Sequence, residues 1–192
     1  MRFFFLLIQV IHIGDQLTPM KLVGVERGCL GIAFFQHTFI LGFPSPASRV
    51  VRMSEEGEVL NTLTYDSSGN TLFSRPFFIL VENTTDSARI LVSDDGNATV
   101  YMLDVDLQLL QAFQHPSSGT LCGLAAVGGG QVLVLVWGTS TLHLLDLTTG
   151  QWQTLLGRKE GLEWSYSLVY NQAMKKLFVG GCHDVKVYTV SG

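Results

Sequence analysis

Charged residues are scarce in this chain, and their scarcity excludes several classes of protein. Only 15% of the 192 residues are Asp, Glu, Lys or Arg, whereas 47% are apolar. Disordered chains show the opposite balance, so we expect one folded domain with a large buried core. The net charge is −4, and the Lys and Arg residues are scattered along the sequence. No basic stripe therefore points to a nucleic-acid partner, although folding could still gather one.

Cysteine is also scarce. Cys29, Cys122 and Cys182 are odd in number, lie far apart and form no CxxC motif. They provide neither the even count of a disulfide framework nor the spacing of a zinc site. We expect reduced, partly buried thiols in a cytoplasmic protein, with no metal ion and no cofactor.

Sustained helical periodicity is missing, so we expect strands to dominate and no helix to exceed about two turns. The N-terminal run Phe3–Ile8 behind Arg2 is too short to span a bilayer as a helix. Its residues predict a buried strand. The alternative is a signal-peptide core, which would make the protein secreted and give meaning to the glycosylation triplets at Asn83 and Asn97.

Short apolar runs separated by turn residues are abundant instead. In Ile90–Asp106, two such runs flank Ser93-Asp94-Asp95-Gly96-Asn97, which predicts a hairpin with a positive φ angle at Gly96 or Asn97. The same pattern recurs about every 45 residues, with Ile32, Ile79, Leu124 and Leu168 at equivalent places.

Each repeat holds up to four short strands, which indicates an all-β protein with the four-stranded antiparallel blades of a β-propeller. A β-sandwich also has many short strands but no reason to repeat in phase. We place the blades at about 29–75, 76–120, 121–164 and 165–192, behind an N-terminal strand segment, 1–28. Leu124, Leu133 and Leu144, from the three inner strands of the third blade, are predicted to be core.

The second unit resembles an NHL repeat, a motif of many β-propellers. The likeness rests on Pro76-x-x-Ile79, Ile90-Leu91-Val92-Ser93-Asp94, Gly96-Asn97 and Val100-x-x-Leu103-Asp104. The third unit departs from the pattern at Val136–Ser140. The end of the chain, from Leu177 to Tyr188, resembles the close of the NHL propeller in invertebrate tripartite-motif proteins.

This resemblance implies a six-bladed ring, of which the chain holds four blades. We expect a fragment that can self-associate, with 1–28 as a remnant of a preceding blade. Alternatively, Phe3–Ile13 or Met20–Val25 closes a four-bladed ring as the missing outer strand. The resemblance also implies a non-catalytic scaffold that binds a protein through loops on one face. The alternatives are an RNA-binding NHL module and a propeller hydrolase or lyase with a metal in the central channel.

No cysteine–histidine spacing of a RING or B-box is present, so the chain itself is assigned no ubiquitin-ligase activity and no catalytic residue. Recognition is expected in the connections between strands, where rigid blades hold variable loops. The candidate partner-binding residues there are Arg75, Trp137, Arg158, Lys159 and Trp164. Trp152, which alternates with polar residues in a fourth strand, is expected to pack between blades.

Three other groups are interpreted as structural. Asp94, Asp95 and Asn97 carry oxygen donors, but they lack a closing Glu and are predicted to cap a tight turn rather than to bind calcium. The histidines His115, His143 and His183 fall in different units without a nucleophile. Gly128–Gly130 is predicted to be a hairpin turn and not a phosphate loop.

Overall fold

Antiparallel strands make up almost the whole fold. The computed structural model describes residues 6–13, 16–44, 47–83 and 88–190. Within these residues the only helix is the 3₁₀ turn η1 (Arg158–Glu160), so the prediction of an all-β chain is confirmed. No helix in the described part of the chain is long and apolar enough to cross a membrane.

The strands form five sheets, which we name in chain order. The N-terminal hairpin is β1 (Leu6–Ile13) and β2 (Leu17–Val25). Blade 1 is β3 (Gly31–Phe35), β4 (Thr38–Phe43), β5 (Arg49–Ser54) and β6 (Val59–Leu63). Blade 2 is β7 (Pro76–Asn83), β8 (Ala88–Asp94), β9 (Thr99–Leu103) and β10 (Leu109–Gln114). Blade 3 is β11 (Leu121–Gly128), β12 (Gln131–Val136), β13 (Thr141–Asp146) and β14 (Trp152–Leu156). Blade 4 is β15 (Ser165–Asn171), β16 (Lys176–Gly181) and β17 (Val185–Thr189).

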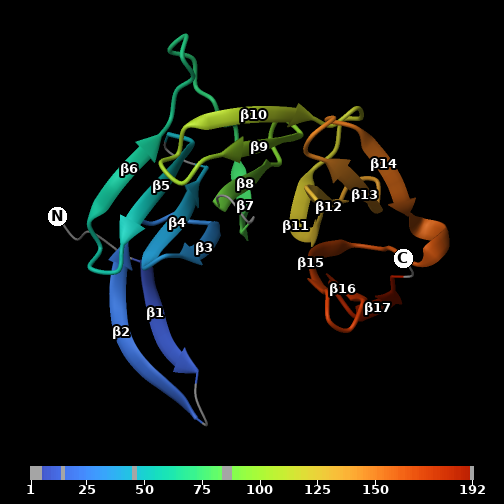
Figure 1. The fold of residues 1–192 in the computed structure, drawn as a ribbon, viewed down its shortest axis with the longest axis horizontal. Coiled ribbons are helices and arrows are strands. Elements are labelled where there is room, and N and C mark those ends of the chain that lie inside the picture. The colour runs from blue at the N-terminus through green and yellow to red at the C-terminus, as the bar shows by residue number, and fades with distance from the viewer. Residues whose placement is uncertain (1–5, 14–15, 45–46, 84–87, 191–192) are drawn as a thin grey trace.

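Within each sheet, every strand pairs antiparallel with the next one in the chain, so every sheet is a simple meander. These are the predicted blades of a β-propeller. Figure 1 shows the sheets following one another around an open arc, with the N-terminal hairpin at one end and blade 4 at the other. The two ends stand apart.

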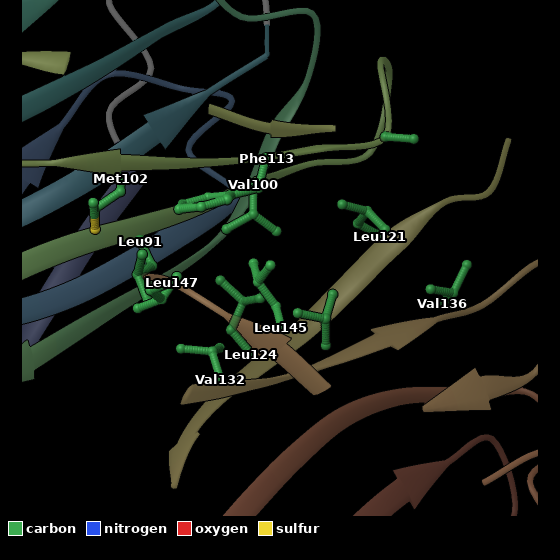
Figure 2. Close-up of a cluster of buried hydrophobic side chains, with 12 residues drawn as sticks. Leu91, Val100, Met102, Phe113, Leu121, Leu124, Val132, Val136, Leu145 and Leu147 are labelled. Atoms are coloured by element: carbon green, nitrogen blue, oxygen red, sulfur yellow. The ribbon is translucent and has the colours of Figure 1, made fainter. Parts of the chain in front are cut away.

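Both faces of the inner strands are apolar because each blade lies between two others. In β8, Ile90, Leu91 and Val92 are all fully buried although neighbouring residues of a strand point to opposite faces. Leu91 packs in a cluster with Leu124 and other residues of blade 3, which Figure 2 shows. Ile90 and Val92 pack in another cluster with blade 1. Stacking on both sides thus explains why these strands read as continuous apolar runs.

The N-terminal hairpin packs on blade 1 and does not complete blade 4. Val23 and Val25 of β2 are buried against Leu41 and Met53 of blade 1. β1 pairs with β2, and blade 4 stays three-stranded in the described part of the chain. The expectation that Met20–Val25 closes the ring is therefore wrong for this structure. Part of Phe3–Ile13, residues 3–5, lies outside the described residues.

The turns agree only in part with the sequence. Gly128, Gly129 and Gly130 all have positive φ in the β11–β12 turn, as predicted. In the β8–β9 turn it is Ala98, at 54°, that takes the positive φ and not Gly96 or Asn97. Residues 84–87, which connect β7 to β8, lie outside the described residues.

Two of the three predicted core residues of blade 3 are buried, namely Leu124 and Leu133. Leu144 is only half-buried, packed at the edge of the cluster between blades 3 and 4. It lines an apolar groove of about 380 Å³ together with Leu155 of β14 and Tyr188 of β17. Blade 4 has only three strands in the described part of the chain, and none of its described residues covers this part of blade 3 completely.

Candidate functional site

The candidate site lies on one edge of the blades, where the first strand of each blade begins and the second ends. One backbone hydrogen bond recurs there. The residue after the second strand donates its amide to the carbonyl before the first strand: Asp95 to Arg75, Trp137 to Thr120, and Cys182 to Trp164. We call this edge the loop face. The repeat therefore places three pairs of residues from the connections between strands on one surface, one pair in each of blades 2, 3 and 4.

A hollow of about 250 Å³ opens on the loop face between blades 3 and 4. It is lined by Trp137, Gly138, Ser140, Arg158, Glu163 and Trp164. Three of the five predicted binding residues are among them, although 27 positions separate the two tryptophans in the sequence. The start of η1 supplies Arg158, and Trp164 directly precedes β15.

Aromatic rings form the wall of this hollow. Trp137 lies between Trp164, at 5.6 Å between ring centroids, and Tyr166, which it stacks on at 6.1 Å. Trp164 is 57% exposed and takes a positive φ of 48°, so its backbone turns the large ring outward at some conformational cost. Tyr166 also contacts the thiol of Cys182, 3.3 Å from its hydroxyl, and this hydrogen bond raises the pKa of the phenol.

A second hollow of about 210 Å³ adjoins the first and shares Trp137 with it. Arg75, Phe77, Asp95, Thr120, Cys122 and Tyr166 complete its lining. Two N–H groups of the Arg75 guanidinium donate hydrogen bonds to the two carboxylate oxygens of Asp95, and the Asp95 side chain is almost fully buried. This ion pair raises the pKa of Arg75. The positive charge of Arg75 is thus balanced by the carboxylate of Asp95.

Asp94 fixes the loop under this pair. Its carboxylate accepts the backbone N–H groups of Ser74 at 2.6 Å, Arg75 at 2.8 Å and Gly96 at 3.0 Å. Burial raises its pKa, while these three donors act in the opposite direction. Asp94 therefore caps the turn as predicted, by accepting the amide of Gly96. Its bonds to Ser74 and Arg75 also attach the turn to the connection between blades 1 and 2. Asn97 binds the hydroxyl of Tyr101 instead of the turn.

Lys159 is the predicted site residue that lines neither hollow. It is exposed in η1, next to Arg158. Tyr166, Glu163 and Asp95 also line the two hollows and were not predicted as site residues. The repeat could have identified Tyr166. The residues two positions before the equivalent Ile79, Leu124 and Leu168 are Phe77, Cys122 and Tyr166. All three of these line the second hollow.

The titratable groups near the site are held in structural roles. Burial raises the pKa of the Cys122 thiol to about 11, so it is protonated at neutral pH and is no activated nucleophile. His115 and His143 come from different repeat units, and the structure brings their rings together at 4.6 Å between centroids, with Trp152 against them. Trp152 packs between blades 2 and 3, as predicted. Among the described residues no three His, Cys, Asp or Glu side chains are grouped to hold a metal ion.

The class defined by this architecture is the β-propeller. No protein-family model matches the sequence, and the search of curated proteins found no match. Solved structures do match. The Cps50 (Swd1) β-propeller domain of Myceliophteria thermophila is 13% identical with a TM-score of 0.61, over 85% of this chain and 51% of that one. The computationally designed Ika4 protein is 17% identical with a TM-score of 0.59, over 85% of this chain and 91% of that one.

A third match is a protein of unknown function from Bacteroides caccae, at 17% identity and a TM-score of 0.63. It covers 92% of this chain and 65% of that one. The chain thus spans about half of the Cps50 domain and about two thirds of the bacterial protein. At these identities the likeness shows the fold alone, and the NHL resemblance stays a prediction.

Proposed function

We propose that the chain is a non-catalytic interaction module that binds a protein partner through the loop face, as the NHL propellers of tripartite-motif proteins do. The observation that carries this proposal is the convergence of Trp137, Trp164 and Arg158 on one hollow. Tryptophan and arginine are the residues that most often anchor protein–protein interfaces. Trp164 is exposed beside a half-buried Trp137 and offers such an anchor.

The charges of the loop face favour a protein over RNA. Single-stranded RNA is bound by aromatic rings that alternate with unpaired cations along a groove. Here Arg75 is already paired with Asp95, and Glu163 faces the same hollow as Arg158. Of the predicted binding residues, Arg158 and its neighbour Lys159 would then remain to meet phosphates. A mixed, aromatic-rich surface of this kind fits a peptide segment with an apolar side chain and an acidic group.

Peptide display on the wild-type chain tests the proposal. We expect selected peptides to bind at least about tenfold more weakly to Trp164→Ala, because truncating an interface anchor commonly costs more than 1 kcal/mol. Leu110→Ala is the matched control, since Leu110 is similarly exposed but lies on the outer strand β10. Selected peptides that bind both variants equally would contradict the proposal. Binding of single-stranded RNA that is lost in Arg158→Ala would instead favour the RNA-binding alternative.

A further inference from the structure

The two ends of the arc each present an apolar sheet face on which no other sheet of the described residues packs. In the N-terminal hairpin, Ile8 pairs with Val23 on the side that packs against blade 1, whereas Leu7 and Leu22 lie on the opposite side. In blade 4, Leu168, Leu177 and Val179 pack against blade 3. The opposite face of blade 4 carries Val169, Phe178, Val185 and Val187.

Some of the uncovered residues of blade 4 occupy positions that are buried in blade 3. Val185 pairs with Gly180 as Leu142 pairs with Leu135 in blade 3. Leu142 is 1% exposed because blade 4 covers it, whereas Val185 is 66% exposed. Similarly, Leu22 is 60% exposed on the face where a preceding sheet would pack. The ends are therefore the two unmatched halves of an interface that recurs between the blades.

We propose that a second copy of this chain supplies the missing half, so that the hairpin face of one copy packs head to tail on the blade 4 face of another. A single copy does not bring its own ends together, as Figure 1 shows. The match covers 85% of this chain and 51% of the Cps50 β-propeller domain, so the matched parts of two copies hold about as many residues as one such domain. Such an interface is heterologous, since different surfaces of the two copies meet.

Lys176 is a charged residue on the open face of blade 4, where it pairs with Thr189 at the start of β16. The open hairpin face carries Leu7, Gln9, Leu22 and Gly24, none of which would repel it. Lys21 lies on the covered side of the hairpin, 3.3 Å from Glu56. Lys186 lies on the covered side of blade 4, 3.2 Å from Asp184. The proposed contact is therefore mainly apolar, like the contacts between blades, and we expect it to tolerate high salt.

Sedimentation of the full chain and two variants tests the head-to-tail contact. Leu22→Asp disables the hairpin face and Val187→Asp disables the blade 4 face. Both residues are more than half exposed, so the folded copy tolerates the charge. We expect the wild type to self-associate below about 100 μM and each variant alone to do so at least about tenfold more weakly, because a charge must then be buried unpaired.

Mixing the two variants gives the decisive result. Leu22→Asp keeps an intact blade 4 face and Val187→Asp an intact hairpin face, so the mixture should form a one-to-one complex and nothing larger. The control Leu110→Asp, on an outer strand away from both ends, should associate like the wild type. A wild type that stays monomeric, a mixture that forms no complex, or equal loss in the control would each overturn the proposal.

Discussion

At the scale of single residues, the buried pair His115 and His143 is the feature with the clearest physical consequence. Both side chains are less than a tenth exposed. The Nε2 atom of His143 lies 2.9 Å from the hydroxyl of Thr141, and its Nδ1 lies 3.3 Å from that of Thr154. Burial, together with the neighbouring His115, lowers the pKa of His143 from 6.5 to about 4. The folded protein therefore keeps this ring neutral under mildly acidic conditions.

This lowered pKa predicts a loss of stability in acid. The unfolded chain takes up a proton on His143 below about pH 6.5, and the folded chain does so only near pH 4. The stabilising contribution of the neutral ring is thus complete above pH 6.5 and disappears as the pH falls toward 4. The full effect is about 3 kcal/mol. Denaturant unfolding of the wild type and His143→Gln, compared at pH 7 and pH 4.5, measures it.

The comparison between variants isolates this histidine from the acidic groups. Burial raises the pKa of Asp94 and of Glu82, which favours the folded state as the pH falls and partly offsets the effect of His143. His143→Gln should lose less stability than the wild type on acidification, whereas His183→Gln, at an exposed position, should behave like the wild type. Equal losses in all three proteins would contradict the prediction.

At the scale of strands and sheets, glycines set how closely neighbouring blades approach. A Cβ atom at Gly31 of β3 would lie 2.6 Å from the carbonyl oxygen of Phe77 in β7. A Cβ atom at Gly123 of β11 would lie 3.0 Å from the amide nitrogen of Leu168 in β15. Both obstacles are backbone atoms of the next inner strand, so they cannot swing aside. Close contact between blades thus explains why a glycine precedes both Ile32 and Leu124.

Replacing either glycine by alanine should destabilise the protein by about 1–3 kcal/mol, because the blades must separate slightly. Gly138→Ala is the matched control, since its added Cβ would have no atom within 4 Å. Thermal unfolding followed by circular dichroism gives the comparison. A melting temperature for Gly123→Ala equal to that of the control would show that blades 3 and 4 are not packed as closely as described.

The strands could be predicted from the sequence because local rules determine them. Continuous apolar runs such as Val132–Val136, bounded by turn residues and repeated in phase, identify all the strands of blades 1 to 4. The same repeat placed Trp137 and Trp164 in connections. Contacts between units escaped prediction, because nothing local states that Arg75 meets Asp95 or that His115 meets His143. Those contacts depend on the stacking of blades, which periodicity does not specify.

The N-terminal hairpin also shows that the sequence predicts strands without specifying which sheet they pack against. Apolar residues in Phe3–Ile13 and Met20–Val25 suggested strands, and strands are present over their described residues. Their composition suits either an outer strand of blade 4 or a partner for blade 1, since both offer an apolar surface. The short connection between them allows the two segments to pair with each other, and this local pairing is the one observed.

At the scale of the whole molecule, the sheets contact mainly their neighbours along the arc, so stability is a sum of sheet and interface contributions. Blades 2 and 3 are covered on both faces, and blade 4 on one. Val134 and Val179 allow a matched comparison, because both lie in the second strand of a blade and both are fully buried. Blade 3 has four strands and a neighbour on each face, whereas blade 4 has three described strands and a neighbour on one face.

We expect the backbone amide of Val179 to exchange its hydrogen for deuterium at least about tenfold faster than that of Val134, because opening blade 4 breaks one interface instead of two. Monomeric Val187→Asp at low concentration is the protein to measure, so that no second copy protects the end. Equal exchange rates would mean that the arc opens all at once. With unequal rates, loss of blade 4 leaves blade 3 as the new terminal sheet, covered on one face only, so the arc would fray inward one sheet at a time.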